Sequence, residues 1–583
     1  MRTYAPPTED YHFLLTKVLL FDAAMAELGK TGVDAALMVT ILKEAGRFCS
    51  ERLQPLNRSG DEEGSRLESG AVHTPAGFAE VYRQFTSGGW TSLSAHPAYG
   101  GQGLPFVAQL WLDEMISATN LSFGLFPALT RGATEAIAAH ASESLKSAYL
   151  PPMISGEWSG AMALTESGAG TDLALLKTKA EPNGDDSYSV TGTKIFISSG
   201  DHDFGGNIVH LVLARLPDAP AGVKGISLFI VPKFMPDQAG SFTERNAMWV
   251  GALEKKMGIH AQPTCVMNYD GATGWLVGQP HRGLAAMFTM MNAERLMVGI
   301  QGLGVAGAAY QQAAAYAQER LQGRGTDGGS EPVAIIEHAD VRRMLLNTRA
   351  FVEAGRALAG WTAIQLERAY AHPDAAERAK SDAMVALITP VVKAAFTDFG
   401  FESAVQAQQV FGGHGYIREW GMEQYVRDAR IAQIYEGTNG VQAIDLVGRK
   451  LGLAGGAVVE CFFDMVSADL AQAAATAGEL PVVAKTADAL VLLREATASL
   501  RGASADAVGA AAVDYLRLFA LVSMGWMWAR MAAAASKGGT PFLEAKRHVA
   551  DFFAQRMLPQ VQGLAASISA GEAAIMALPS HAF

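Results

Sequence analysis

The chain has 583 residues, 49% of them hydrophobic and 18% charged, which excludes both a single small module and a disordered chain. Its 46 Lys and Arg residues against 58 Asp and Glu residues give a net charge of -12, without a basic block, so nucleic acid is not expected as a partner. The three cysteines, Cys49, Cys265 and Cys461, lack metal-ligand spacing, which argues against a metal site or a disulfide framework and favours a reducing, cytoplasmic compartment.

The predicted elements divide the chain into four parts. Residues 1–160 repeat apolar side chains every three or four positions, which predicts an N-terminal helical domain. Residues 161–282 hold short β-branched and aromatic runs between turn residues, which predict a middle β domain. Long Ala-rich helical patterns then predict a four-helix bundle over 283–454 and an additional helical domain over 455–583. The expected fold class is mainly α with a central β domain.

Membrane and export signals are not expected. The N-terminal residues "MRTYAPPTEDYHF" lack the basic start and apolar run of a signal peptide. The most apolar stretch, "LFALVSMGWMWA" from Leu518, lies between Arg517 and Arg530 and is shorter than the roughly twenty residues that span a bilayer. It is predicted to be a buried helix rather than a transmembrane segment.

The segment "GLGVAG", Gly302 to Gly307, fits the dinucleotide-binding pattern G-x-G-x-x-G. That fingerprint requires a strand before the first glycine, because the turn from strand to helix places N–H groups on the pyrophosphate. The preceding residues "AERLMVGIQ" have a helical pattern instead. The small residues are therefore expected to let two helices approach closely, and a nicotinamide enzyme is disfavoured.

Two stretches of the β domain are ambiguous when each is taken alone. "MALTESGAGTDL" from Met162 combines hydroxyls with three small residues, which suits both a backbone that approaches a flat ligand and an ordinary turn. "TGTKIFISSG" from Thr191 is more simply a hairpin arm, whose alternation would place Phe196 and Ser198 on one face. Similarly, Arg320 and Arg324 suit the C-terminus of a long helix, where cations favour the helix dipole.

The stretch "RIAQIYEGTNGVQAI", Arg430 to Ile444, contains an unusual acid. Glu436 stands between apolar residues and a Gly-Thr-Asn-Gly turn that precedes a helical pattern. A carboxylate there is either solvated at a helix start or held in a dry pocket for chemistry, and the stretch alone leaves both open.

Taken together, the motifs resemble the acyl-CoA dehydrogenase family of flavoproteins. They occur in the family's order as "LTESGAGTD", "GTKIFISSG", "NAERL" with "YAQERLQGR", "QVFGGHGY" and "RDARIAQIYEGTNG", over roughly residues 80 to 450. The extra C-terminal helices resemble a larger branch that includes bacterial long-chain acyl-CoA dehydrogenases and 3-methylmercaptopropionyl-CoA dehydrogenases. The resemblance implies a helical domain, a β-barrel-like domain and a four-helix bundle, followed here by the C-terminal extension.

The resemblance also implies FAD as the cofactor, an acyl-CoA substrate and an electron-transfer flavoprotein as electron acceptor. Matching positions would contact FAD through Leu164, Thr165, Thr171, Phe196, Ser198, Arg320, Gln409, Gly413 and Thr438, and substrate through Thr171, Arg295 and Gly437. In the family the adenine end of FAD is held partly by the neighbouring subunit, which implies a homodimer or a higher homo-oligomer. Thr438 additionally begins a predicted helix, whose free N–H groups suit a phosphate.

The implied reaction is α,β-desaturation of an acyl-CoA thioester to the trans-2-enoyl-CoA, as in fatty acid β-oxidation. Glu436 matches the family's base, which takes the α-proton while N5 of FAD takes the β-hydride. Apolar neighbours would desolvate this carboxylate and raise its pKa, and its N–H would donate to the thioester oxygen. The substrate is expected to be a fatty acyl-CoA or 3-methylmercaptopropionyl-CoA, and the sequence does not give its chain length.

Some positions depart from the family pattern, and two other functions stay open. Ser167 stands where proline is common, Gly440 where Gln or Glu is common, and Ala443 where Arg is frequent. The alternatives are an acyl-CoA oxidase, which passes electrons to oxygen, and a catalytically silent acyl-CoA-binding relative. Peroxide release under air would favour the oxidase, whereas an intact Glu436 favours an active enzyme.

Overall fold

The computed structural model describes residues 2–237, 241–326 and 329–583, and the chain forms two compact units. Unit one contains Met1–Arg47, Pro105–Ala118 and Val298–Phe583. Unit two contains Phe48–Leu104 and Thr119–Met297. The described elements are mainly helical in the N-terminal part, stranded in the middle and mainly helical again to the C-terminus, as the sequence predicts, with short hairpins at 66–73 and 321–334 as additions.

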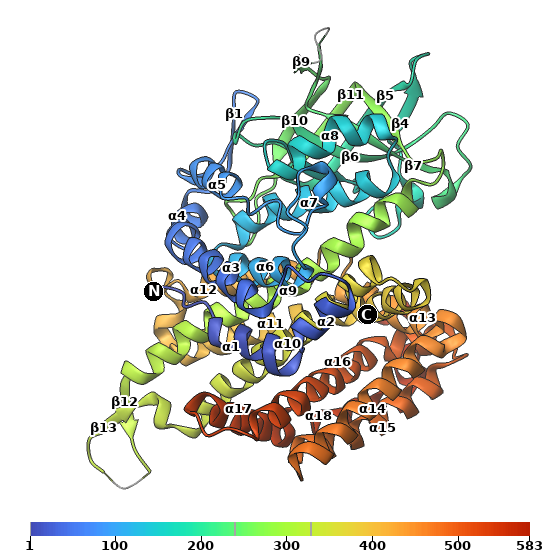
Figure 1. Cartoon of the computed structure of the whole chain (residues 1–583). Coiled ribbons are helices and arrows are strands. Elements are labelled where there is room, and N and C mark those ends of the chain that lie inside the picture. The colour runs from blue at the N-terminus through green and yellow to red at the C-terminus, as the bar shows by residue number, and fades with distance from the viewer. Residues whose placement is uncertain (1, 238–240, 327–328) are drawn as a thin grey trace. The chain divides into compact units, whose positions relative to one another are not determined.

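Unit two contains a seven-stranded sheet that closes on itself (Figure 1). Strand β7 pairs with both β6 and β11, so β11, β5, β4, β6 and β7 form a ring, with β10 and β3 beside it. β6 and β7 are nearly continuous apolar runs, as strands buried on both faces require. The strands are β3 (Ser159–Ala163), β4 (Lys179–Pro182), β5 (Ser187–Ser198), β6 (Ile208–Arg215), β7 (Ile226–Pro232), β10 (Met248–Leu253) and β11 (Thr264–Val277).

Two apolar cores stabilise unit two. Side chains such as Val190, Val212 and Phe229 fill the inside of the strand ring, and their burial is the main favourable term for closing it. A second core packs helix residues such as Ile137 against the opposite face of the sheet. The remaining elements of unit two are β1 (Arg66–Glu68), β2 (Ala71–His73), β8 (Phe234–Pro236), β9 (Phe242–Arg245), α4 (Pro55–Glu63), α5 (Phe78–Ser87), α7 (Leu121–His140), α8 (Glu143–Ser155) and the start of α9 (Gly283–Glu319).

Unit one is a layered arrangement of helices around α16, which contacts α10, α11, α13, α14, α15, α17 and α18. The last helices, orange to red in Figure 1, are the C-terminal extension. Besides α9 and the hairpin β12 (Leu321–Arg324) and β13 (Pro332–Ala334), the elements are α1 (Thr8–Phe13), α2 (Phe21–Glu27), α3 (Ala35–Phe48), α6 (Phe106–Thr119), α10 (Ala339–Ala371), α11 (Ala375–Val410), α12 (Met422–Ala432), α13 (Asn439–Gly448), α14 (Ala457–Ala477), α15 (Pro481–Leu500), α16 (Ala505–Ala535), α17 (Pro541–Phe552), α18 (Gln560–Ser569) and α19 (Ala573–Met576).

The glycines of "GLGVAG" lie in the middle of α9 and serve helix packing, as predicted. A Cβ at Gly302 would overlap the backbone of Phe396 in α11, and a Cβ at Gly304 would overlap the backbone of Glu114 in α6. From α11, Gly400 makes the matching approach, since its Cβ would lie 2.5 Å from the carbonyl oxygen of Gly302. The residues before these glycines belong to the same helix and not to a strand, so the glycines do not form a dinucleotide-binding turn.

The stretch from Leu518 is part of the buried helix α16, as predicted. By length and composition alone, α11, residues Asn439–Ala477 and α16 are long and apolar enough to cross a bilayer. Within the protein, however, 78% of the apolar window of α11 and 61% of that of α16 are buried. Packing thus accounts for much of the apolarity of α11 and α16, whereas only 33% of the apolar window within Asn439–Ala477 is buried.

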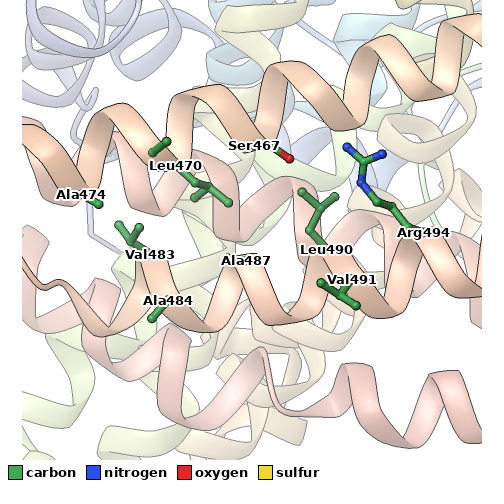
Figure 2. A pocket seen from close by; sticks show the side chains of 10 residues that line it. Ser467, Leu470, Ala474, Val483, Ala484, Ala487, Leu490, Val491 and Arg494 are labelled. Carbon is green, nitrogen blue, oxygen red and sulfur yellow. The ribbon is translucent and has the colours of Figure 1, made fainter.

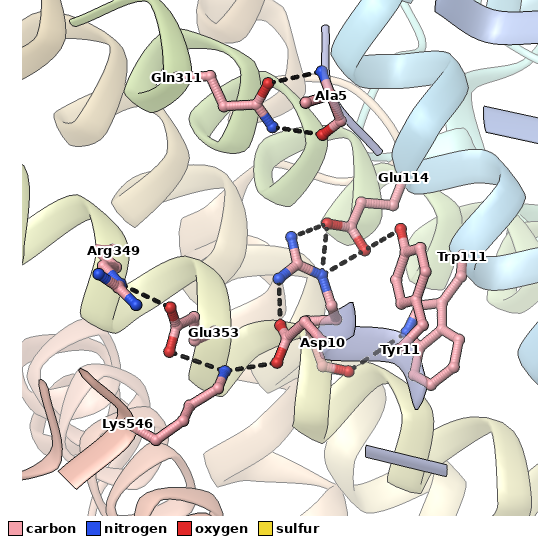
Figure 3. A network of polar contacts seen from close by, with 10 residues as sticks. Ala5, Asp10, Tyr11, Trp111, Glu114, Gln311, Arg349, Glu353 and Lys546 are labelled. Carbon is pink, nitrogen blue, oxygen red and sulfur yellow. Dashed lines mark hydrogen bonds and ion pairs between the residues drawn. The ribbon is translucent and has the colours of Figure 1, made fainter. Parts of the chain in front are cut away.

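A buried ion network links the N-terminal helix, the bundle and the C-terminal extension in unit one (Figure 3). Its members are Asp10 (α1), Glu114 (α6), Arg349, Glu353 and Arg356 (α10), and Lys546 (α17). Lys546 contacts both Asp10 and Glu353, and its Nζ lies 2.9 Å from Oε2 of Glu353. Three acidic side chains thereby form ion pairs with three basic side chains, and buried charges are tolerated when they are paired in this way.

Candidate active site

The residues around Glu436 form a short loop between α12 and α13, in unit one. Glu436 and Gly437 both have left-handed backbone, with φ of 56° and 87°. Glu436 as a whole is half-buried, and its Oε2 atom is shielded from solvent. We call residues 433–439 the base loop. Glu436 therefore lies outside the helices, and its carboxylate is not freely solvated.

Gly437 is required by the conformation of the base loop. A Cβ at this position would lie 2.5 Å from Nε2 of the fully buried Gln442, and the φ of 87° disfavours every L side chain. The missing Cβ of Gly437 thus leaves room for Gln442 within the chain. The contact of Gly437 with substrate stays a prediction.

Thr438 is the N-cap of α13, as the pattern predicts. Its Oγ1 accepts a hydrogen bond from the N–H of Val441 at 3.3 Å, and the first turn of this ten-residue helix begins directly after it. The hydroxyl proton stays available as a donor. Ala443, which replaces the family's frequent arginine, is fully buried in α13, whereas a Cβ at Gly440 would meet nothing closer than 4.0 Å.

Three residues predicted for the adenine end of FAD occupy one end of unit one. Arg320 follows α9 and is exposed, as are Gln409 in α11 and Gly413 just after it. The two segments are joined by Tyr316, whose ring stacks on Phe411 at 4.1 Å and whose hydroxyl lies 2.8 Å from Nδ1 of His414. The aromatic contacts therefore bring the end of α9, next to Arg320, beside the end of α11, which carries Gln409 and Gly413.

The "LTESGAGTD" segment of unit two is a tight turn. Glu166 and Ala169 exchange backbone hydrogen bonds of 3.0 Å, which places Ser167 and Gly168 at the tip. Leu164 is buried, Thr165 is half-buried, and Thr171 is exposed beyond the turn. A Cβ on Gly168 or Gly170 would meet no atom within 4 Å, so the backbone here faces open space.

A buried lysine and glutamate hold this turn against strand β5. Lys194 is fully buried, and its Nζ donates to the carbonyl of Leu164 and to Oε1 of Glu166, both at 2.9 Å. The glutamate also accepts hydrogen bonds from the N–H groups of Lys177 and Thr178 and from the Thr178 hydroxyl. A backbone bond of 2.9 Å from Ile195 to the Thr165 carbonyl completes the attachment.

Burial and charge act in opposite directions on this pair. Burial lowers the pKa of Lys194 to about 8, although Glu166 favours the charged ammonium. Burial disfavours the charged carboxylate of Glu166, but Lys194 and the hydrogen bonds from Thr178 and Lys177 outweigh it and lower the pKa. The pair therefore holds the turn with both groups charged at neutral pH.

Phe196 and Ser198 lie at the end of β5, next to the turn. The pairing with β11 is irregular here, with two residues of β5 between partners where β11 has one, and Phe196 has a φ of 60°. Ile197 is buried, whereas Phe196 is 59% exposed and Ser198 is half-buried. The predicted alternation therefore holds at these three residues, and an aromatic face lies open beside the glycines.

Arg295 lies in α9 and is buried. Its Nη1 donates to Oδ1 of Asn292 at 3.2 Å, and its guanidinium lies 6.0 Å from the Phe288 ring. Nothing in these contacts tests its predicted role toward substrate.

Sequence reasoning missed the residues that support the site. The sequence places Lys194 only in a hairpin arm, yet a lysine within a strand of a β domain is a signal that it pairs with an acid where the strand is buried. Lys393 and Gln442, which contact the base loop, were not singled out. Lys393 lies 44 positions before Gly437, so no local spacing could have found that contact, and the turn that brings Gln442 back onto Glu436 has no sequence pattern of its own.

The residues of unit two fit a flavin. An open glycine turn lets a backbone approach a flat ring, and an exposed aromatic side chain and two hydroxyls stand next to it. In unit one, the N–H groups of Asn439 and Val441 at the start of α13 are already bonded to Gln433 and Thr438, so a phosphate contact at Thr438 stays a prediction. The open turn at Gly168 and Gly170 and the exposed Phe196 are thus the features that suit FAD.

A groove of about 420 Å³ lies elsewhere, on the outer side of the α14–α15 hairpin (Figure 2). It is lined by Ser467, Leu470, Ala471, Ala474, Val483, Ala484, Ala487, Leu490, Val491 and Arg494. Its single guanidinium is already engaged by Glu460 and Asp464, so the groove offers an apolar surface and no chemistry.

Comparison with known proteins identifies the family. The chain matches the models "Acyl-CoA dehydrogenase, N-terminal domain" over residues 38–157, "middle domain" over 161–272 and "C-terminal domain" over 281–451, and "Acetyl-CoA dehydrogenase C-terminal like" over 462–579. The chain belongs to the acyl-CoA dehydrogenase family. It is therefore an oxidoreductase of an FAD-dependent family, with the fold that the motifs predict.

Similar proteins with curated names cover nearly the whole chain. A 3-methylmercaptopropionyl-CoA dehydrogenase from Ruegeria pomeroyi is 43% identical, over 95% of this chain and 96% of its own. A butyryl-CoA dehydrogenase from Syntrophomonas wolfei is 33% identical (98% and 96%), and the broad-specificity linear acyl-CoA dehydrogenase FadE5 of Mycobacterium tuberculosis is 32% identical over both full chains. The C-terminal extension is thus shared by these acyl-CoA dehydrogenases.

Solved structures agree on the fold. Caenorhabditis elegans ACDH-11 in complex with C11-CoA superposes with a TM-score of 0.78 at 19% identity, covering 96% of this chain and 93% of its own. An acyl-CoA dehydrogenase complexed with FAD from Bacillus anthracis gives 0.74 at 21% identity, covering 92% and 88%. These likenesses extend through the C-terminal helices.

Proposed function

We propose that this acyl-CoA dehydrogenase desaturates a short acyl-CoA thioester between its α and β carbons, with Glu436 as the base. The observation that carries the proposal is the base loop, which holds a partly shielded carboxylate in a left-handed conformation at the family's motif position. A solvated helix-start acid would need neither the strain nor the shielding.

In the proposed mechanism, the carboxylate of Glu436 takes the α-proton of the bound thioester. Its own backbone N–H donates to the thioester oxygen as negative charge develops there. Gly437 lets the chain turn tightly enough to present both groups, since it has no Cβ. When bound, FAD supplies the acceptor for the β-hydride.

The residues proposed to hold FAD divide into two sets. Leu164, Thr165, Thr171, Phe196 and Ser198 would hold the ring, and Thr438 a phosphate. Arg320, Gln409 and Gly413 would hold the adenine end from a neighbouring subunit, which is supported by their shared exposure at one end of unit one. We therefore propose a homodimer or higher homo-oligomer, with Arg295 and Thr171 on the substrate.

For the substrate, we propose 3-methylmercaptopropionyl-CoA or a fatty acyl-CoA of similar length. The 43% identity to an enzyme named for the first compound supports this choice, and the butyryl-CoA dehydrogenase supports a short chain. Electron-transfer flavoprotein is the proposed acceptor. The cytoplasmic location stays a prediction. The division of the chain into four domains at residues 160, 282 and 454 also stays a prediction, and the residue ranges matched by the four family models support it.

Anaerobic bleaching of the flavin by a panel of thioesters tests the proposal. Propionyl-CoA, butyryl-CoA, 3-methylmercaptopropionyl-CoA and palmitoyl-CoA are compared by the rate of bleaching per thioester concentration. We expect the three short thioesters to bleach fastest. Fastest bleaching by palmitoyl-CoA would contradict the short-chain assignment, and stoichiometric peroxide release under air would show an oxidase instead.

A further inference from the structure

The base loop has a conformation that its own residues do not favour. Left-handed backbone at a non-glycine residue such as Glu436 is sterically disfavoured, because its Cβ comes too close to the following carbonyl oxygen. Such a conformation persists only where the surroundings fix it. The contacts around the base loop should therefore show what fixes it.

A buried lysine of α11 reaches the base loop. Lys393 is fully buried, and its Nζ donates to the carbonyl oxygen of Gly437 at 2.7 Å and to Oδ1 of Asn439 at 2.9 Å. Hydrogen bonds from a charged donor are about twice as strong as neutral ones. The ammonium therefore fixes the carbonyl directly after the left-handed pair.

Asn439 passes this support on to the rest of α11. Its Nδ2 donates to Oδ1 of Asp398 at 2.7 Å and to Oγ1 of Thr397 at 2.9 Å. Asp398 also accepts from Nε2 of Gln433 at 2.6 Å, at the other end of the base loop. One turn of α11 thus holds both ends of the loop.

Two further helices, α13 and α9, also contact the base loop. Gln442 of α13 is fully buried, and its Nε2 donates to the carbonyl oxygen of Glu436 at 3.3 Å. Tyr435 donates through its hydroxyl to Oε1 of Gln301 in α9. Glycine contacts at Gly302 and Gly400 allow α9 to approach α11 closely enough for this arrangement.

We propose that Lys393 is a positioning residue for the base, acting through the carbonyl of Gly437, with Gln442 as its counterpart on the carbonyl of Glu436. Together they fix the two left-handed residues, and so fix where the Glu436 carboxylate and N–H point. The inference rests on the proposed function of Glu436. A purely structural role would instead stabilise the bundle without affecting proton removal.

The variant Lys393→Met tests the proposal, because methionine fills the site but cannot donate. We expect the limiting rate of anaerobic bleaching to fall by about tenfold to a hundredfold, as small misplacements of a catalytic group do. The thioester concentration at half-maximal rate should change by less than about threefold, because the variant keeps the contacts that bind the thioester before proton removal. FAD content should stay at the wild-type level.

Lys546→Met is the matched control, because it removes another fully buried lysine of unit one that pairs with two acceptors away from the base loop. We expect its bleaching rate to match the wild type wherever it is folded. Hydrogen exchange adds a readout that does not need turnover. Residues 431–442 should exchange faster in Lys393→Met and at the wild-type rate in the control.

Three results would overturn the proposal. The first is bleaching by Lys393→Met within about twofold of the wild type, and the second is unchanged exchange of residues 431–442. The third is an equal slowing in Lys546→Met, which would assign the effect to stability. If Lys393→Met does not fold, Gln442→Leu replaces it with the same expectations. If the wild type bleaches with no thioester, the proposed function fails, and the exchange experiment still decides the positioning role.

Discussion

Replacing Lys546 by methionine removes a fully buried ammonium from the ion network of unit one. At neutral pH the variant would enclose three carboxylates with two guanidinium groups, so one negative charge lacks compensation. Removing one partner of a buried ion pair costs about 3–5 kcal/mol. Each affected carboxylate keeps one arginine, Arg356 for Asp10 and Arg349 for Glu353, so we expect about 3 kcal/mol.

Urea denaturation of the holoenzyme, followed by tryptophan fluorescence, measures this loss. Trp528 is a local reporter, since its ring centroid lies 6.0 Å from Nζ of Lys546. Lys485→Met, at an exposed position of α15, is the control and should change the free energy of unfolding by no more than about 0.5 kcal/mol. A loss below about 1 kcal/mol in Lys546→Met would refute the reasoning.

The deficit should also shrink as the pH falls from 7 to 5. Burial disfavours ionisation of Asp10, but Lys546 and Arg356 outweigh it and hold its pKa below the ordinary value, so Asp10 stays ionised over this range in the wild type. Without the ammonium, one carboxylate can take up a proton and remove the uncompensated charge. A deficit that stays constant would mean that lost packing, not charge, explains the effect.

Two other perturbations concern unit two. Lys194→Met leaves Glu166 buried without its ammonium, so we expect the turn to loosen and the FAD dissociation constant to rise by about tenfold, measured by flavin release; unchanged retention would contradict the role of the pair. His202 and His210 are buried, and burial lowers the pKa of each to about 4. Because the unfolded chain takes up protons below about pH 6.5 and the folded chain does not, stability is lost as pH falls toward 4, by about 2 kcal/mol per histidine at pH 5. Unfolding of His210→Gln should show a shallower acid loss than the wild type, and identical curves would refute this assignment.

Local patterns were sufficient for the elements and for the motifs. The helical period predicted α9 and α16. Because the residues before "GLGVAG" have a helical pattern, the sequence predicted a helix-packing contact there rather than a dinucleotide site, and the contact at Gly302 confirms it. The shift to short β-branched runs predicted a β domain, and the family resemblance implied its barrel-like closure, which the ring of strands confirms. Such predictions succeed because each depends on neighbours within one or two turns of the chain.

Long-range pairing was not predictable from the pattern. Lys546 and Asp10 are separated by 536 positions, and Lys393 and Gly437 by 44, so nothing in either local sequence identifies the partner. The conformation of Glu436 was equally hidden, because left-handed backbone at glutamate has no sequence signature comparable to glycine. The roles of Arg320, Gln409 and Arg295 toward ligands stay predictions.

The flavin bleaching of Glu436→Gln tests the central claim most directly. The amide keeps the shape of the side chain but cannot take a proton, so the variant should remain folded and yellow. With the thioester that bleaches the wild type fastest, we expect anaerobic bleaching to slow by about 10²–10⁴-fold, the usual contribution of a general base. Bleaching at the wild-type rate would contradict the assignment of Glu436 as the base.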